Sequence, residues 1–158
     1  VINITHPLVS LNSLDMEYIP DSPYGFLQEI YRHDPWKMLI GCIFLNQTTR
    51  KQVDKIREEF FLKYPDAEKA SKADLKEMAS IIRPLGFYNR RSKTIKKFSE
   101  EYIDSTWTEP SELYGIGNYA QASWDIFQKY DVSVETNDGP LNKYLSWARE
   151  YIKRNKSK

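Results

Sequence analysis

A tight turn that contains two glycines is the first segment whose residues could bind a ligand. Residues 113–119 read LYGIGNY, so Gly115 and Gly117 flank one aliphatic residue between two helical patterns. Two glycines permit a very tight turn, and Ile116 can then insert into the core. Such a turn exposes backbone N–H groups at the start of the next helix, where positive partial charge favours a phosphate. A helix C-cap followed by a turn would have the same sequence, so this motif alone leaves both interpretations open.

A carboxylate follows this turn, at the start of the last helical pattern. Asp138 precedes Gly139 and Pro140, whose residue types suit the first turn of a helix. An aspartate in this position is typical of an N-cap or an Asx-turn, and spacing alone favours that structural role. Glu135 is a second carboxylate in the same segment.

The elements that must position these segments are expected to be helices, because apolar residues recur at helical spacing almost throughout the chain. The clearest pattern has Asp34 as N-cap and Pro35 as the first helical residue. Ser92 is a candidate cap for a later helix, and residues 132–134 give a weak strand signal. The apolar stripes that predict helices are 26–31, 36–44, 53–60, 75–82, 95–102, 120–127 and 141–152. We therefore expect an all-α domain of six to eight short helices.

The domain organisation follows from the same patterns. Residues 1–20 have weaker periodicity and are expected to form an N-terminal arm, and residues 21–152 are expected to form one domain. Residues 153–158 are expected to be a basic, disordered tail. No apolar stretch approaches the roughly 18 residues that a membrane span needs, and no signal-peptide pattern opens the chain.

Charge is polarised along the chain, although the net charge is only +1. Residues 1–31 contain acids but no lysine or arginine, and residues 83–99 contain basic residues but no acid. A protein that binds a polyanion through one face needs such a distribution. Solvated helix faces and a frayed tail would produce the same pattern, so charge alone does not decide.

Cysteine and histidine are too few for a structural zinc site or an iron–sulfur cluster, because the chain has one cysteine and two histidines. Cys42 lies in an apolar helical stripe and is expected to be buried and inert. It cannot form an intrachain disulfide, which fits a reducing compartment without requiring one.

The order of these segments resembles the helix-hairpin-helix DNA glycosylase superfamily. Within it the chain is similar to the glycosylase domains of the methyl-CpG-binding thymine glycosylases, which act on G·T and G·U mismatches. The shared stretches keep their order over roughly residues 20–150; they are residues 33–37, 43–46, 84–86, 93–95, 113–119 and 141–144. The resemblance implies a helix-hairpin-helix glycosylase fold without an iron–sulfur cluster. It also implies excision of thymine or uracil from mismatched duplex DNA.

The resemblance assigns catalysis to Asp138 and Tyr119. Breaking an N-glycosidic bond builds positive charge on the sugar, which a fixed carboxylate stabilises. Asp138 is preferred to Glu135, because only Asp138 has the family continuation with Leu141 and Lys143 in register. Tyr119 occupies the place of the Schiff-base lysine of bifunctional members, so the resemblance implies a monofunctional enzyme.

The resemblance also assigns residues that bind DNA. Tyr119 would line the pocket of the flipped base, and Gln28 would hydrogen-bond the pyrimidine unless it is an exposed surface glutamine. Gln47 matches the residue that fills the vacated stack. Similar members have arginine here, so it stays open how strictly the enzyme requires guanine opposite the lesion. Phe87 matches a second wedge or is an ordinary core residue. The residues expected to contact the DNA backbone are Gly115, Gly117, Asn118, Arg90, Arg91, Lys93 and Lys143.

Two other functions stay open from the sequence. One is a glycosylase for another base, adenine or an alkylated purine, and the other is a non-catalytic helix-hairpin-helix module that binds DNA. For a glycosylase of thymine or uracil, or of another base, the resemblance implies no cofactor, no metal and no membrane partner. It implies a monomer that acts on duplex DNA, in the nucleus of a eukaryote or otherwise in the cytoplasm.

Overall fold

Helices make up the regular structure in the computed structural model, which describes residues 19–104 and 106–156. Within these ranges there are eight α-helices, two 3-10 helices and no strand, which confirms the predicted all-α class. The elements in chain order are α2 (Leu27–Ile30), α3 (Pro35–Leu45), α4 (Arg50–Lys63), α5 (Ala67–Ser71), α6 (Leu75–Ile82), η2 (Arg83–Leu85), α7 (Tyr88–Ile103), η3 (Pro110–Glu112), α8 (Asn118–Phe127) and α9 (Gly139–Lys156).

Side-chain caps define where several of these helices begin. The Asp34 carboxylate accepts a hydrogen bond from the Lys37 backbone N–H at 3.1 Å, and Pro35 is the first residue of α3, as the sequence predicts. Thr49 and Gln52 form a reciprocal capping box at the start of α4. Because such caps satisfy helix N–H groups that otherwise lack a partner, each is worth about 1 kcal/mol.

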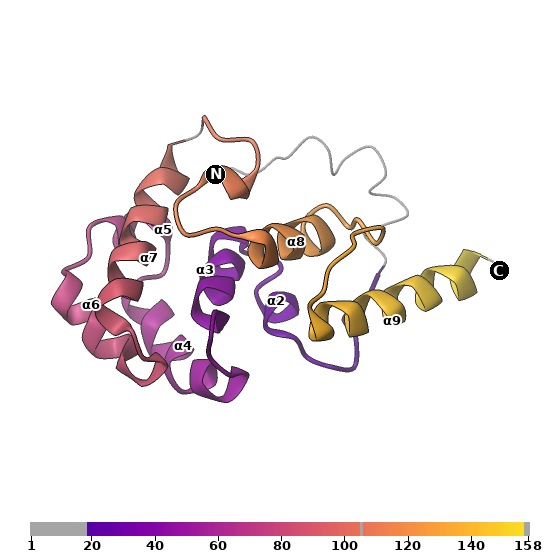
Figure 1. The fold of residues 1–158 in the computed structure, drawn as a ribbon, viewed down its shortest axis with the longest axis horizontal. Helices are drawn as coiled ribbons and strands as arrows, with labels where there is room; N and C mark the ends of the chain where they lie inside the picture. The colour runs from indigo at the N-terminus through magenta and orange to yellow at the C-terminus, as the bar shows by residue number, and fades with distance from the viewer. Residues whose placement is uncertain (1–18, 105, 157–158) are drawn as a thin grey trace.

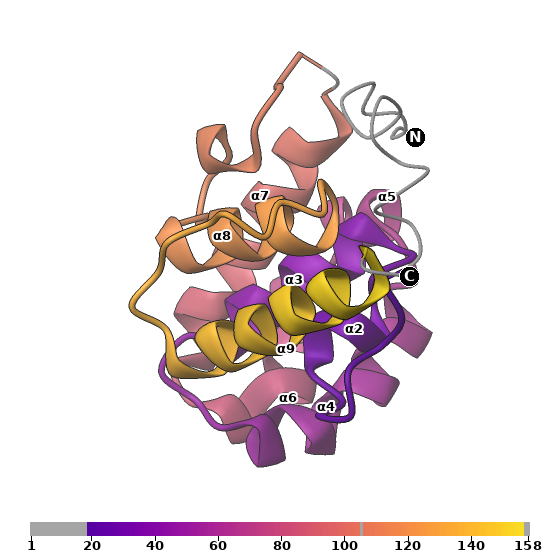
Figure 2. The same cartoon turned by 90° about the vertical axis from the view of Figure 1, so that its right-hand side faces the viewer.

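Helix α3 is the central element of the arrangement (Figure 1). On one side of it lie α4 to α7, in which α7 packs against α5 and α6 and α4 packs against α6. On the other side α2 and α8 both contact α3, and α9 lies beyond them (Figure 2). The two groups of helices are therefore joined mainly through α3.

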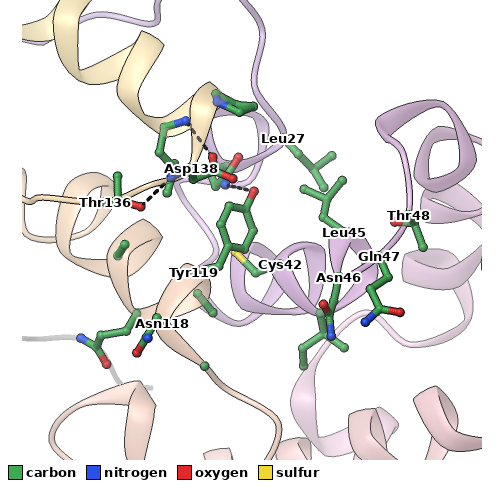
Figure 3. A pocket seen from close by; sticks show the side chains of 18 of the residues that line it. Leu27, Cys42, Leu45, Asn46, Gln47, Thr48, Asn118, Tyr119, Thr136 and Asp138 are labelled. Atoms are coloured by element: carbon green, nitrogen blue, oxygen red, sulfur yellow. Dashed lines mark hydrogen bonds between the residues drawn. The ribbon is translucent and has the colours of Figure 1, made fainter.

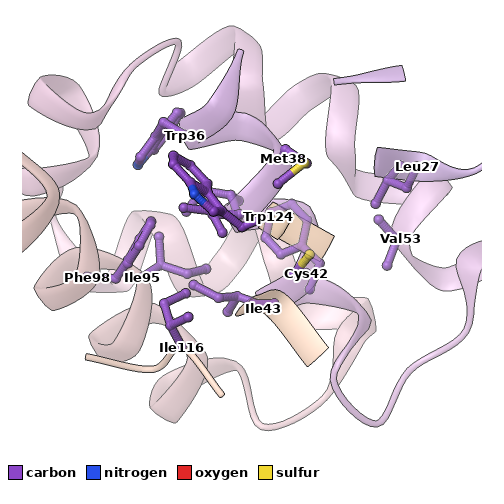
Figure 4. Close-up of a cluster of buried hydrophobic side chains, with 14 of the residues drawn as sticks. Leu27, Trp36, Met38, Cys42, Ile43, Val53, Ile95, Phe98, Ile116 and Trp124 are labelled. Atoms are coloured by element: carbon purple, nitrogen blue, oxygen red, sulfur yellow. The ribbon is translucent and has the colours of Figure 1, made fainter. Parts of the chain in front are cut away.

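The hydrophobic core surrounds α3 (Figure 4). Trp36 is 2% exposed, and its ring nitrogen donates to the hydroxyl of Ser99, a fully buried residue of α7, at 3.1 Å. Phe44 and Phe60 meet edge to face at 5.0 Å between ring centroids. Ile116, the aliphatic residue between the two hairpin glycines, is 8% exposed and belongs to the same cluster, which confirms its predicted insertion into the core.

The structure differs from the sequence analysis in several local features. Helix α7 begins at Tyr88, one turn before the candidate cap Ser92, whose buried hydroxyl donates to the Tyr88 carbonyl at 2.6 Å. Helix α5 has only five residues, too few for an apolar period, and was not predicted. Residues 132–134 form no strand.

Helix α9 continues to Lys156, so residues 153–156 are helical rather than disordered. Basic residues in the last turn of a helix interact favourably with its negative end, which explains the extension. Residues 157–158 and most of the predicted arm, residues 1–18, lie outside the described residues. Of that arm, Ile19 is packed into the core at 3% exposure.

No helix among the described residues combines the length and apolar character that crossing a membrane requires.

Candidate active site

An open groove with a volume of about 1340 Å³ collects most of the predicted site residues (Figure 3). It is lined by α2, the α3–α4 connection, the start of α7, the glycine hairpin and the segment before α9. The predicted residues that line it are Gln28, Gln47, Phe87, Arg90, Arg91, Gly115, Gly117, Asn118, Tyr119 and Asp138. Lys93 and Lys143 are exposed but do not line the groove.

Asp138 is both a helix cap and a lining residue of the groove. One carboxylate oxygen, Oδ2, accepts a hydrogen bond from the Leu141 backbone N–H at 2.9 Å. The Asp138 backbone N–H donates to the Thr136 hydroxyl at 3.1 Å, which holds the turn before the helix. No hydrogen bond from the described residues reaches Oδ1. The cap therefore fixes the carboxylate against the positive end of α9 and leaves one oxygen for chemistry.

Glu135 also lines the groove, but its side chain is exposed. No hydrogen bond within the described ranges restrains its carboxylate, whereas Asp138 is held by its cap. A charge that must stabilise a transition state acts best from a fixed position. The geometry therefore favours Asp138 over Glu135.

Gln28 and Tyr119 meet in the groove from α2 and α8. Gln28 is 4% exposed, so the interpretation as a surface glutamine is wrong. Its Nε2 donates to the Tyr119 hydroxyl at 2.7 Å and to the Ser123 hydroxyl at 3.1 Å. Burial raises the pKa of Tyr119 above its ordinary value, and the nearby Asp138 charge acts in the same direction. Tyr119 is therefore a neutral phenol near pH 7.

The segment before Gln28 is anchored by two residues that the sequence did not single out. The buried carboxylate of Glu29 accepts hydrogen bonds from the backbone N–H groups of Ser22 and Phe26, at 2.6 and 3.1 Å. Arg50, on α4, donates to the Gly25 carbonyl at 2.8 Å. Glu29 binds the N–H of Ser22 seven positions before it, and Arg50 binds the carbonyl of Gly25, which is 25 positions before it. Helical patterns in the sequence do not reveal such pairs.

Two side chains stand at the edges of the groove on left-handed backbone. Gln47 is exposed with φ of 59°, and Phe87 is 58% exposed with φ of 46°. Phe87 is therefore not a core residue. The guanidinium of Arg90 lies 5.1 Å from the centroid of the Phe87 ring. An exposed aromatic ring beside a cation suits contact with nucleic acid.

Arg91, which is predicted to contact the DNA backbone, lines the groove but exposes little of its surface. It is 7% exposed, and its guanidinium donates to the carbonyls of Gly86 and Ile43 at 2.9 and 3.3 Å. Burial lowers the pKa of Arg91, with a smaller contribution from the neighbouring Arg90. Its donors tie the turn before Phe87 to α3, and its contact with the DNA backbone stays a prediction.

The glycine hairpin has the geometry that its sequence predicts. Gly115 has φ of +83°, and a Cβ atom there would lie 2.5 Å from Thr94 Cγ2 of α7. Gly117 and Asn118 are exposed at the start of α8, a helix of ten residues. Their backbone N–H groups have no acceptor in the described part of the chain, so they remain available to an anion.

Sequence reasoning did not find Ser123, Cys42 or Thr136 as parts of this site. Ser123 lies one helical turn after Tyr119, and that spacing could have placed it on the same face of α8. Thr136, two residues before Asp138, has the spacing of a side-chain turn. Cys42 is 3% exposed, as predicted, but it also lines the groove (Figure 3).

Metal ligation is not supported by this arrangement. In residues 19–104 and 106–156, no three His, Cys, Asp or Glu side chains come together in a way that could hold an ion.

The chain also matches a protein-family model. The model described as "HhH-GPD superfamily base excision DNA repair protein" matches residues 40–157. Among curated proteins, a methyl-CpG-binding domain protein 4-like protein of Arabidopsis thaliana is 36% identical over 131 residues, covering 82% of this chain and 29% of the relative. A thymine/uracil-DNA glycosylase of Pyrobaculum aerophilum is 40% identical over 94 residues, covering 55% and 41%.

A solved structure of a thermostable thymine-DNA glycosylase is also similar. It superposes with a TM-score of 0.59 at 27% identity, covering 73% of this chain and 56% of that one. The chain thus spans less than two thirds of the length of each of these relatives.

Proposed function

The chain belongs to the HhH-GPD superfamily of base excision DNA repair proteins, and on this premise we propose that it is a monofunctional glycosylase that excises thymine or uracil from G·T and G·U mismatches in duplex DNA. The observation that carries the proposal is the meeting of Asp138, Tyr119 and Gln28 in one groove. The thymine and uracil named for the similar proteins support the choice of base.

In the proposed reaction the target nucleotide leaves the duplex and its base enters the groove, where Gln28 and Tyr119 contact its edge. The bond between sugar C1′ and the base nitrogen breaks, and its electron pair leaves with the base. The Asp138 carboxylate stabilises the positive charge that develops on the sugar. Water then adds to C1′, and its proton goes to the departing base anion. The products are the free base and an intact abasic site.

Tyr119 makes the proposed enzyme monofunctional. A phenol cannot form the imine through which a lysine would attack C1′ and lead to strand cleavage. Borohydride should therefore trap no covalent adduct between the protein and the DNA. A trapped adduct would refute this part of the proposal.

The proposed DNA surface surrounds the groove. The N–H groups of Gly117 and Asn118 would bind phosphate at the start of α8, next to Gly115. Arg90 and Lys93 project from α7, and Lys143 lies with its Nζ 4.4 Å from the centroid of the Tyr24 ring at the groove. Affinity should fall steeply with salt, because basic residues displace counterions from the phosphates.

A cleavage assay tests the proposed activity. Labelled duplexes with G·T, G·U and A·G mismatches are incubated with the protein and then cleaved with alkali at abasic sites. The proposal expects product from G·T or G·U, and product only from A·G would favour an adenine glycosylase. Binding without product from any duplex would favour a non-catalytic module.

The same proposal covers the base opposite the lesion, the oligomeric state of the protein and its cellular compartment. Gln47 would fill the vacated stack and face the base opposite the lesion, where a neutral amide can bond several bases, so we expect guanine to be preferred but not required. We propose a monomer that acts where the genome lies, in the nucleus of a eukaryote or otherwise in the cytoplasm.

A further inference from the structure

The amide of Gln28 is held at its nitrogen end. An amide nitrogen carries two hydrogens, and Nε2 of Gln28 has two acceptors, the hydroxyls of Tyr119 and Ser123, at 2.7 and 3.1 Å. The side chain is 4% exposed, yet it lines the groove. No hydrogen bond from any described residue reaches Oε1. The carbonyl oxygen is therefore the end of the amide that is available to a ligand.

Ser123 holds the amide in this orientation from a fully buried position on α8. Its hydroxyl oxygen accepts from Nε2 of Gln28 at 3.1 Å, beside the second acceptor, the hydroxyl of Tyr119. In a reversed amide the carbonyl oxygen would face these two hydroxyl oxygens, and both N–H hydrogen bonds would be lost. Because Gln28 and Ser123 are both buried, such a loss would leave polar groups without a partner.

We propose that Ser123 is a positioning residue that fixes the orientation of the Gln28 amide and so makes the groove select bases that offer an N–H donor. This inference rests on the proposed function. Tyr119 accepts a hydrogen bond from Gln28, so its own proton can be donated to a base carbonyl. An acceptor beside a donor matches the N3–H and the neighbouring carbonyl of uracil or thymine.

A double-mutant cycle on uracil excision under single-turnover conditions tests this role. Ser123→Ala should slow excision about tenfold in the otherwise unchanged protein, because the amide is then free to reverse. In a Gln28→Met background the same change should matter less than about twofold, because no amide remains to be oriented. An equal loss in both backgrounds would overturn the proposal.

Ser99→Ala is the matched control. Ser99 is also fully buried and accepts a hydrogen bond from a buried side-chain N–H, that of Trp36, but Trp36, unlike Gln28, does not line the groove. It should destabilise the fold in a comparable way and change excision less than about twofold. If Ser99→Ala slows excision as much as Ser123→Ala, the effect is structural and the proposal fails.

A measurement without DNA separates this inference from the proposed function. In ¹⁵N NMR spectra the side-chain amide protons of Gln28, assigned by their absence in Gln28→Met, should exchange slowly with water. Ser123→Ala, or Ser123→Cys, whose sulfur is only a weak acceptor, if the first variant does not fold, should speed this exchange about tenfold or more. Unchanged exchange would overturn the positioning role even in an active enzyme. An inactive protein with the expected exchange would overturn only the proposed function.

Discussion

Replacing Asp138 by asparagine separates the two roles that the structure gives this residue. The carboxylate caps α9 through Oδ2, which accepts from the Leu141 N–H at 2.9 Å, and its second oxygen has no partner among the described residues. An asparagine side chain keeps an oxygen that can accept the cap hydrogen bond but removes the negative charge. Asp138→Asn should therefore damage catalysis and leave the fold nearly intact.

The expected magnitudes differ widely. A carboxylate about 4 Å from a unit positive charge contributes roughly 4 kcal/mol at an effective dielectric constant near 20, which corresponds to about a thousandfold in rate. The stability should fall by only about 0.5 kcal/mol, because the cap survives and only the charge at the helix end is lost. Asp138→Ala should lose about 1 kcal/mol, because the cap is lost as well.

The assay combines single-turnover excision from a G·U duplex, affinity for that duplex and urea unfolding. Asp138→Asn should bind within about twofold of the unchanged protein. Glu135→Gln is the control, since it removes an exposed carboxylate from the same groove and should keep its activity. Full activity in Asp138→Asn, with loss in Glu135→Gln, would refute the assignment. A stability loss in Asp138→Asn as large as in Asp138→Ala would refute the account of the cap.

Three further predictions concern the wedge, the hairpin and the core. Phe87→Ala should leave the melting temperature nearly unchanged, because the ring is 58% exposed, but should weaken binding to a G·T duplex in fluorescence anisotropy; a large loss of stability would contradict this. Gly115→Ala should destabilise the fold by more than about 1 kcal/mol in urea, since φ is +83° and Thr94 Cγ2 is 2.5 Å away. Gly139→Ala, whose Cβ meets nothing within 4 Å, should not. Burial raises the pKa of Cys42 from 9.0 to about 12. The buried neutral thiol therefore contributes its full share to the free energy of unfolding below pH 9, and this share is lost as the pH rises toward 12. The slope is at most about 1.4 kcal/mol per pH unit, and urea unfolding of Cys42→Ala should show a flatter profile; an unchanged profile would contradict the shift.

Local features of the fold were predictable because they depend on neighbouring residues. Asp34 and Pro35 define the start of α3 through one cap and one fixed backbone angle. The two hairpin glycines and Ile116 likewise determine a turn and its insertion within a few residues. Ser92 was misread because a buried serine that bonds the preceding turn has the same sequence context as a cap.

Features that depend on distant contacts were not predictable from patterns. The hydrogen bond between Gln28 and Ser123 joins residues 95 positions apart, and helical periodicity does not say which helices meet. Arg90 and Arg91 are equivalent in a count of charges, yet neighbours on a helix point about 100° apart, and only Arg91 is buried. The resemblance to a family supplied the roles of Asp138 and Gln28, which spacing alone left as a cap and a surface residue.

The left-handed backbone at Gln47 and Phe87 has a consequence for the thermodynamics of lesion recognition. A non-glycine residue in this conformation costs about 1 kcal/mol, and here that cost is already met in the free protein. Two proposed wedges that are shaped before DNA arrives lose little conformational entropy on binding, so most of the ordering falls on the displaced nucleotide. Glycine at either position would relieve the backbone and remove the wedge side chain. At the two edges of the groove the protein therefore exchanges part of its folding stability for a smaller entropic penalty in the complex.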